Sequence, residues 1–272
     1  MKIFLIVFLI IIIIYLLVTF IMFLLVSKKF NNELLPMSKG LNEILKPYQS
    51  IIDKGSKWVS DKIINDETSD LYIKSKDGLK LHGLFIENKK SKGIILEVHG
   101  YRSTCERDLY ASCHEYYKMG YSILLIDNRT SNLSEGSYIT FGIRESEDII
   151  CWIKYLNEKY PKQNIILAGI SMGASTILMS LKDVKDENNV KCCLVDSGYI
   201  SAYDEVLYCI KHYFHINGKI FIHMINMWCK LIAKYSLDEK NTVSCMEKSN
   251  IPILFVPNRL LLGHILFEFL FS

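Results

Sequence analysis

The chain has 272 residues, of which 50% are hydrophobic, and a formal net charge of +3 at pH 7. That length is enough for one large α/β domain. The nearly balanced charge, without a basic stripe and interleaved aromatic residues, argues against a nucleic-acid partner. The eight cysteines show neither a C-x-x-C pair nor metal-ligand spacing, so we interpret them as reduced, mostly buried thiols. The sequence contains no cofactor motif.

An apolar segment opens the chain. Residues 3–26 include no charge, proline or glycine. A helix of that length reaches about 36 Å, which is enough to cross the hydrocarbon core of a bilayer. The segment ends at Lys28-Lys29 without a small-residue cleavage site, which favours an uncleaved single-pass membrane anchor over a cleaved signal peptide. The lysines that follow it weakly favour a cytoplasmic domain, and the side of the membrane stays open.

Behind the anchor, the polar segment 27–69 predicts a juxtamembrane linker with one or two short helices, and a domain follows over 70–272. The domain opens with two strands on either side of the turn dipeptide Asp77-Gly78, which predicts an antiparallel hairpin. After the hairpin, strand-length apolar runs alternate with helical segments: strands at 93–98, 121–126, 165–168, 190–195 and 251–256, and helices at 105–119, 141–160 and from Ser171 to Leu181.

This alternation predicts a mostly parallel sheet with helices on both faces and an antiparallel edge. Ligands of such sheets bind at the carboxyl ends of the strands. His99-Gly100, Asp127, Ser171 and Asp196 all stand at those ends, although for each aspartate taken separately a loop or helix cap is the simpler interpretation. The segment from about 200 to 236 is rich in aromatic and apolar residues and predicts a lid of two or three helices.

The clearest chemical signal is the G-x-S-x-G formed by residues 169–173, between a predicted strand and a predicted helix. A serine on such a sharp turn presents its hydroxyl at the surface, and the small residues beside it let strand and helix pack closely. The start of the helix also points free N–H groups at whatever the serine attacks. We therefore interpret Ser171 as a candidate nucleophile.

Over about residues 70 to 255 the chain resembles the α/β-hydrolase superfamily, and within it the membrane-anchored bacterial serine hydrolases of the esterase and S9-peptidase-like type. The resemblance rests on five stretches: H-G-Y-R-S at 99–103, D-N-R-T-S-N-L-S-E-G at 127–136, Y-I-T-F-G-I-R-E-S-E-D at 138–148, G-I-S-M-G-A at 169–174 and V-D-S-G-Y at 195–199. It implies an α/β-hydrolase fold and cleavage of an ester, thioester or amide. The substrate would be a small acyl compound of lipid-like or peptide character.

Carried over to these positions, the resemblance implies that Ser171 is the nucleophile and that the backbone N–H groups of Met172 and Tyr101 bind the oxyanion. The family's acid usually follows the strand at 251–256, in a loop that begins H-G-x-x-D, and its histidine follows one more strand. Here 257–272 is a mostly apolar tail without an aspartate. We therefore expect the last strand and helix of the family to be missing.

Other residues could fill the vacant roles. Asp196 is the alternative acid and His264 an alternative base, with further histidines later in the chain than Ser171 at His212, His215 and His223. An ordinary packed or surface position is the simpler interpretation of each histidine. We expect a membrane-anchored serine hydrolase that is impaired in this chain. The alternative is a non-catalytic or truncated protein of the same fold, which acts as a binding module or has no function.

Overall fold

The computed structural model describes residues 2–28, 46–185 and 188–256, with a seven-stranded sheet in the order β1-β2-β4-β3-β5-β6-β7. The first two pairs, β1 with β2 and β2 with β4, are antiparallel, and all the others are parallel. The predicted hairpin, parallel sheet and antiparallel edge are therefore confirmed. The strands are β1 (Ser69–Lys74), β2 (Lys80–Ile86), β3 (Ile94–Val98), β4 (Ser122–Ile126), β5 (Ile165–Ile170), β6 (Val190–Asp196) and β7 (Ile253–Val256).

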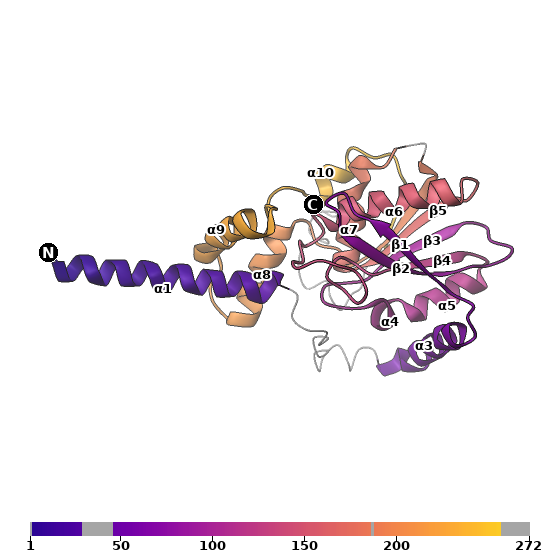
Figure 1. The fold of residues 1–272 in the computed structure, drawn as a ribbon, viewed down its shortest axis with the longest axis horizontal. Coiled ribbons are helices and arrows are strands. Elements are labelled where there is room, and N and C mark those ends of the chain that lie inside the picture. Colours follow the sequence, from indigo (N-terminus) through magenta and orange to yellow (C-terminus); the bar gives the residue numbers. More distant parts are fainter. Residues whose placement is uncertain (1, 29–45, 186–187, 257–272) are drawn as a thin grey trace.

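Helices connect these strands and cover both faces of the sheet (Figure 1). The α-helices are α1 (Lys2–Ser27), α3 (Gln49–Ile64), α4 (Cys105–Asp108), α5 (Tyr110–Lys118), α6 (Glu145–Lys159), α7 (Met172–Ser180), α8 (Ala202–Phe214), α9 (Lys219–Trp228) and α10 (Thr242–Met246). Short 3-10 turns occur at η1 (Lys46–Tyr48) and η2 (Leu181–Asp183), and a π-helical turn at η4 (Cys229–Ala233) extends α9.

Strand alternation divides the core of the sheet between its two faces. On β3, Ile94 and Leu96 pack on the side of α6 and α7, whereas Ile95 packs on the side of α3 and α5. All three side chains are buried. We call these two apolar layers the sheet core. It forms because side chains two residues apart on a strand share a face, and both faces of this sheet are covered.

Two predicted helices differ from the structure at their boundaries. The helix predicted over 105–119 breaks at Leu109, which separates α4 from α5. The helix predicted from residue 141 begins only at Glu145, because Phe141 and Gly142 have φ angles of 51° and 87°, which a right-handed helix does not permit. The spacing of apolar residues that predicted these helices carries no information on backbone angles, so it could not locate these boundaries.

The helix α3 lies within the segment 27–69 that the sequence predicts as a linker. It packs against α5, with Val59 fully buried between the two helices. A Cβ placed on Gly55 would lie 2.5 Å from the carbonyl oxygen of Tyr110, so only glycine permits this close approach. The segment therefore adds a helix to the face of the sheet domain.

A second apolar core lies outside the sheet and joins α1 to the lid helices. We call it the anchor core. It contains residues from the last turns of α1, the loop before α6, the helix α7, and the lid: Met22, Phe23, Val26, Ile139, Phe141, Ile143, Met172, Met179, Tyr199, Ala202, Val206, Ile210, Ile222, Ile225, Cys229, Tyr235 and Leu237. Figure 1 shows α1 projecting from the domain, with α8 and α9 beside its carboxyl-terminal half.

The helix α1 is the one described helix that is long and apolar enough to cross a membrane. By the same test it could be a signal sequence, and its orientation is open. The helical lid predicted at about 200–236 is present as α8, α9 and η4. The tail at 257–272, where we expected the family's last strand and helix to be missing, lies outside the described residues.

Candidate active site

Ser171 occupies the turn between β5 and α7. Its backbone angles, φ 53° and ψ −119°, are ones that residues with a side chain rarely adopt, and such strain is typical of functional sites. Two hydrogen bonds hold the turn: the N–H of Ser171 donates to the carbonyl of Asp196 at 2.8 Å, and the N–H of Ser175 donates to the carbonyl of Ser171 at 3.1 Å. The strained turn is thus tied to the end of β6 and to the first turn of α7.

The two glycines of the motif let the strand and the helix meet. A Cβ placed on Gly169 would lie 2.7 Å from the carbonyl carbon of Gly173. A Cβ on Gly173 would overlap the carbonyl of Val98 and lie 2.8 Å from that of His99. Neither position has room for a side chain, because backbone atoms rather than flexible side chains fill the space. The G-x-S-x-G therefore matches a geometric requirement of this turn.

The loop after β3 reaches Ser171 at Gly100. A Cβ placed on Gly100 would lie 3.5 Å from the Cβ of Ser171, so the two backbones are close neighbours. Asp108 holds the loop: its carboxylate accepts from the N–H of Gly100 at 2.9 Å and from the hydroxyl of Ser103 at 2.6 Å. Tyr101 follows directly, and its N–H is the expected second oxyanion donor. Met172, the expected first donor, begins α7, where N–H groups lack partners within the helix.

The side chain of Tyr101 links this loop to α1. Its hydroxyl donates to the carbonyl of Val26 at 2.6 Å, and its ring stacks on Phe141 at 5.3 Å between centroids. The neighbouring Arg102 guanidinium donates to the carbonyls of Leu25, at 2.5 Å, and Lys28. These side chains satisfy carbonyls that the end of α1 leaves without helical partners, and the cation suits the negative end of the helix dipole.

Asp196, the alternative acid, ends β6 directly beside β5, the strand that leads into the turn at Ser171, which we call the elbow. Burial raises the pKa of its carboxyl group, and the hydroxyl of Ser197 opposes this by donating to one carboxylate oxygen at 2.6 Å. Asp196 contacts Ser171 through its backbone carbonyl, as described above. No described histidine forms a hydrogen bond with the Asp196 carboxylate, so the structure does not show an acid–base pair there.

None of the candidate histidines with a described side chain forms a hydrogen bond with Ser171, and the others have no described side chain. His215 is exposed at the end of α8, where its φ of 55° ends the helix, and the ring of His223 packs against Tyr203. His212 lies on α8, and only its backbone is described; His264 lies outside the described residues. Among the described side chains, none makes a hydrogen bond to the hydroxyl of Ser171. The structure therefore brings together the turn at Ser171 and the loop after β3, and no base contacts Ser171 among the side chains that it describes.

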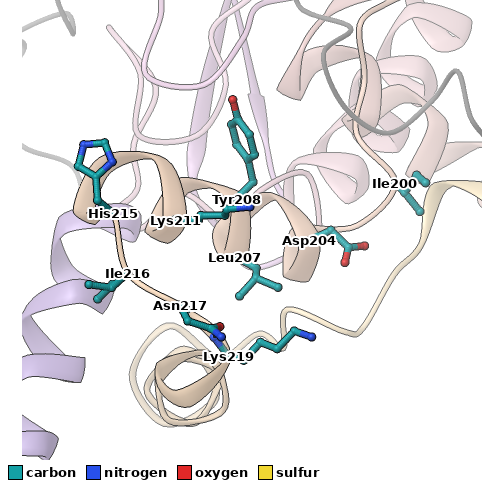
Figure 2. A pocket seen from close by; sticks show the side chains of 10 residues that line it. Ile200, Asp204, Leu207, Tyr208, Lys211, His215, Ile216, Asn217 and Lys219 are labelled. Carbon is teal, nitrogen blue, oxygen red and sulfur yellow. The ribbon is translucent and has the colours of Figure 1, made fainter.

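A cavity of about 890 Å³ lies in the lid, between α8 and the turn that leads to α9 (Figure 2). Its lining is mixed: Leu207 and Ile216 are apolar, whereas Lys211 and Lys219 carry positive charge. Ser171 is not among the lining residues. The cavity is therefore a feature of the lid in this conformation and not a formed acyl pocket at the nucleophile.

His99, Cys105 and Asp127 bring three potential metal-ligand atoms within 4.8 Å of one another. Their atoms are already used in hydrogen bonds. His99 donates from Nδ1 to the carbonyl of Gly100 at 2.9 Å and accepts at Nε2 from the N–H of Asn128 at 3.2 Å. Burial lowers the pKa of His99 and raises that of the Cys105 thiol, so both are neutral. The Cys105 thiol donates to the carbonyl of Ile126 at 3.2 Å, so the three side chains form a buried hydrogen-bond network beneath the strand ends.

Asp127 belongs to the same network. Its carboxylate lies 2.6 Å from Nδ1 of His82 and accepts from the side chain of Asn132 at 3.0 Å. This position fits the capping role that the sequence left open for Asp127. The sequence did not single out Asp108, which orients the oxyanion loop, because a single acidic residue at a helix start resembles an ordinary dipole-stabilising residue.

No family model matches the chain. The curated proteins include the uncharacterized protein YqkD of Bacillus subtilis, which is 20% identical over 194 residues, covering 71% of this chain. The chain spans 63% of the length of that relative.

Among solved structures, the Pyrococcus furiosus esterase Pf2001 is 26% identical with a TM-score of 0.54, covering 70% of this chain and 69% of its own. An α/β hydrolase from Vibrio vulnificus is 19% identical with a TM-score of 0.57, covering 84% and 79% of the two chains, and supports the fold alone. The sheet order, the strained serine turn and these likenesses together place the chain in the α/β-hydrolase superfamily.

Proposed function

We propose that this chain is a membrane-anchored serine hydrolase that cleaves an ester, thioester or amide of a small acyl substrate through Ser171. The single observation that carries the proposal is the strained turn at Ser171, between two glycines that no other residue can replace, with Gly100 alongside. A protein keeps a backbone strain of this kind only where the surrounding structure over-determines it, which is common at functional sites. The likeness to an esterase of 26% identity supports the same reaction class.

The reaction would proceed by acyl transfer. The oxygen of Ser171 forms a bond to the acyl carbon while its proton passes to a base, and the negative charge moves to the carbonyl oxygen. The N–H groups of Met172 and Tyr101 stabilise that oxyanion, an effect typically worth about 3–4 kcal/mol per donor. Collapse expels the alcohol, thiol or amine with the proton, and water then repeats the sequence to release the acid and free Ser171.

The base is the incomplete part of this mechanism. No described histidine side chain forms a hydrogen bond with Ser171, so the base would come from elsewhere, and His212 and His264 are two such residues. Residues 257–272 contain one histidine and no aspartate, so they do not repeat the family's acid and histidine loops. Turnover would be low unless one of these residues reaches Ser171, because a serine hydroxyl without a base is a weak nucleophile.

A second candidate function follows from the same observation. The fold could serve as a non-catalytic binding module, with the elbow retained because α7 belongs to both apolar cores. Ala174 and Ile177 of α7 pack in the sheet core, whereas Met172 and Met179 pack in the anchor core. A glycine-flanked turn at Ser171 would then be needed for packing alone.

A serine-directed fluorophosphonate probe separates the two functions. We expect the detergent-solubilised full chain to be labelled at Ser171, located by mass spectrometry of peptides, and labelling to disappear in Ser171→Ala. The exposed Ser244→Ala variant is the matched control and should label normally. Turnover of short p-nitrophenyl esters should fall by about 10⁴-fold or more in Ser171→Ala if the base is present. A folded chain without labelling or turnover would favour the binding module.

A further inference from the structure

The helix α1 consists of two halves with different surroundings. Up to Ile14 its side chains are largely exposed, as for Phe4, which is 84% exposed. From Tyr15 onward it packs against the lid. The hydroxyl of Tyr15 donates to the carbonyl of Ile220 at 2.6 Å, and the indole N–H of Trp228 donates to Thr19 at 3.2 Å. Both partners belong to α9, so this helix is fastened along the docked half of α1.

The free half of α1 is too short to span a bilayer alone. Its 13 residues, from Lys2 to Ile14, extend about 20 Å, whereas the hydrocarbon core is about 30 Å thick. The missing length is about 10 Å, so the first turns of the docked half would also lie within the hydrocarbon region if α1 spans the membrane. Because α9 is hydrogen-bonded to those turns, α9 would lie at the same depth in the bilayer.

The outward surface of the lid suits that position. Ile220 is 66% exposed and Leu231 is 55% exposed, and Ile216 is exposed in the turn before α9. They adjoin a helix whose own docked half exposes Leu17, Val18, Ile21 and Leu25. We call these exposed apolar residues of α1 and the lid the apolar collar. Exposed apolar side chains on neighbouring elements typically mark a contact surface.

The charges beside the collar fit lipid headgroups. The helix α9 has no acidic residue, and exposed Lys219 precedes Ile220 directly. Lys211 lies across the lid cavity from it, and both lysines line that cavity (Figure 2). Trp228, on the same helix, faces Phe20 of α1 at 5.3 Å between ring centroids. Lysine and tryptophan are residues that commonly stand at the boundary between hydrocarbon and headgroups.

We infer that α9 and the turn before it form a second membrane contact: an interfacial helix held at the bilayer surface by its packing on the anchor. The exposed Ile216 and Ile220 would enter the hydrocarbon boundary to a depth of about 5–10 Å, which is typical of interfacial amphipathic helices. The inference rests on the membrane anchoring in the proposed function and is independent of catalysis. It makes the lid, and the cavity between α8 and α9, part of the membrane surface.

Photocrosslinking tests this contact. The full chain, reconstituted in vesicles of equal parts phosphatidylethanolamine and phosphatidylglycerol, would carry one diazirine amino acid in place of Ile10, Ile64 or Ile220. We expect strong lipid adducts at 10 and 220, and about tenfold fewer at 64, because carbenes react with acyl chains in hydrocarbon and with water at an aqueous surface. Ile64 is the matched control, because it is a helical isoleucine on α3 that is more exposed than Ile10 and Ile220.

Each other outcome overturns the inference. Adducts at 10 but not at 220 would mean that α1 enters the bilayer and leaves the lid outside it. A crosslinked protein dimer at 220, without lipid adducts, would assign the apolar collar to a second copy of the chain. An absence of adducts at 10 would remove the anchoring itself. None of these results depends on turnover, so failure here is distinguishable from failure of the hydrolase proposal.

Discussion

The sheet core and the anchor core meet on α7, but they are built from the sequence in different ways. The sheet core uses short apolar runs that follow one another along the chain, such as β3 and β4, which pair directly. The anchor core gathers single residues from widely separated segments, including Phe23 from α1, Ile222 from α9 and Tyr235 beyond η4. Ser171 lies where the two cores adjoin, because α7 contributes to both.

This difference shows that the end of α1 is part of the folded domain. Ser27 at its end is fully buried, its hydroxyl lies 3.3 Å from that of Tyr235, and its carbonyl accepts from the N–H of Ile139 at 2.7 Å. The same end accepts hydrogen bonds from Tyr101 in the oxyanion loop. Substitutions in α1 should therefore alter the packing around the candidate site. The following predictions test how strongly the two cores are coupled in stability.

The largest effect is expected at Phe23, which is fully buried in the anchor core. Phe23→Ala should lower the free energy of unfolding in detergent solution by about 3–5 kcal/mol, because it removes a large apolar side chain and leaves a cavity. The measurement is chemical unfolding followed by circular dichroism. Phe4→Ala on the exposed half of α1 is the matched control and should leave stability unchanged. Equal effects of the two substitutions on stability would contradict the packing of α1 into the domain.

The next largest effect on stability is expected at Gly173, where α7 approaches the end of β3 closely. Gly173→Ala would push a methyl group against the carbonyls of Val98 and His99, and we expect it to destabilise the chain by about 1–3 kcal/mol. Probe labelling of Ser171 should fall at the same time, because the turn must shift. An unfolding midpoint like that of the unmodified chain would contradict the packing described for the elbow.

Within the sheet core, Glu97 provides a pH test. Burial raises its pKa from 4.5 to about 8, with the opposing hydrogen bond from Ser112 too weak to compensate. Between those values the folded chain retains a proton that the unfolded chain has lost. Stability should therefore fall as pH rises through this window, by about 1.4 kcal/mol per pH unit at most.

Glu97→Gln should flatten that pH dependence, because the amide cannot ionise and still accepts from Ser112. Thermal unfolding measured at several pH values between 5 and about 8 would show it. The exposed Glu106→Gln is the control and should retain the original slope. If Glu97→Gln keeps the same slope as the unmodified chain, another group causes the pH dependence.

The smallest effect is expected at the link between the cores. Tyr101→Phe keeps the stacking on Phe141 and removes the hydrogen bond to Val26, which should lower stability by about 1 kcal/mol. If α1 positions the oxyanion loop, the rate of probe labelling at Ser171 should also fall. A loss of stability with an unchanged labelling rate would mean that this hydrogen bond stabilises the docking of α1 without positioning the loop at Ser171.

Much of the sheet could be predicted from the sequence. The turn dipeptide Asp77-Gly78 and the alternation of strand-length and helix-length apolar runs are local patterns, and they predicted the strand positions closely. The elbow was equally local, because G-x-S-x-G states a steric requirement that Gly169 and Gly173 meet in the structure. The boundaries at Leu109 and Phe141 escaped prediction, because they depend on backbone angles that apolar spacing does not encode.

The sequence by itself thus determined the order of the strands along the chain, the elbow at Ser171 and the apolar length of α1, because each is a property of neighbouring residues. Only the tertiary structure decided that α1 packs on α9, that Tyr101 binds the end of α1, and that Asp108 holds Gly100 beside Ser171. These contacts join residues that are far apart in sequence or that carry no pattern of their own. Their free energy comes from burial and hydrogen bonds that exist only once the chain has folded.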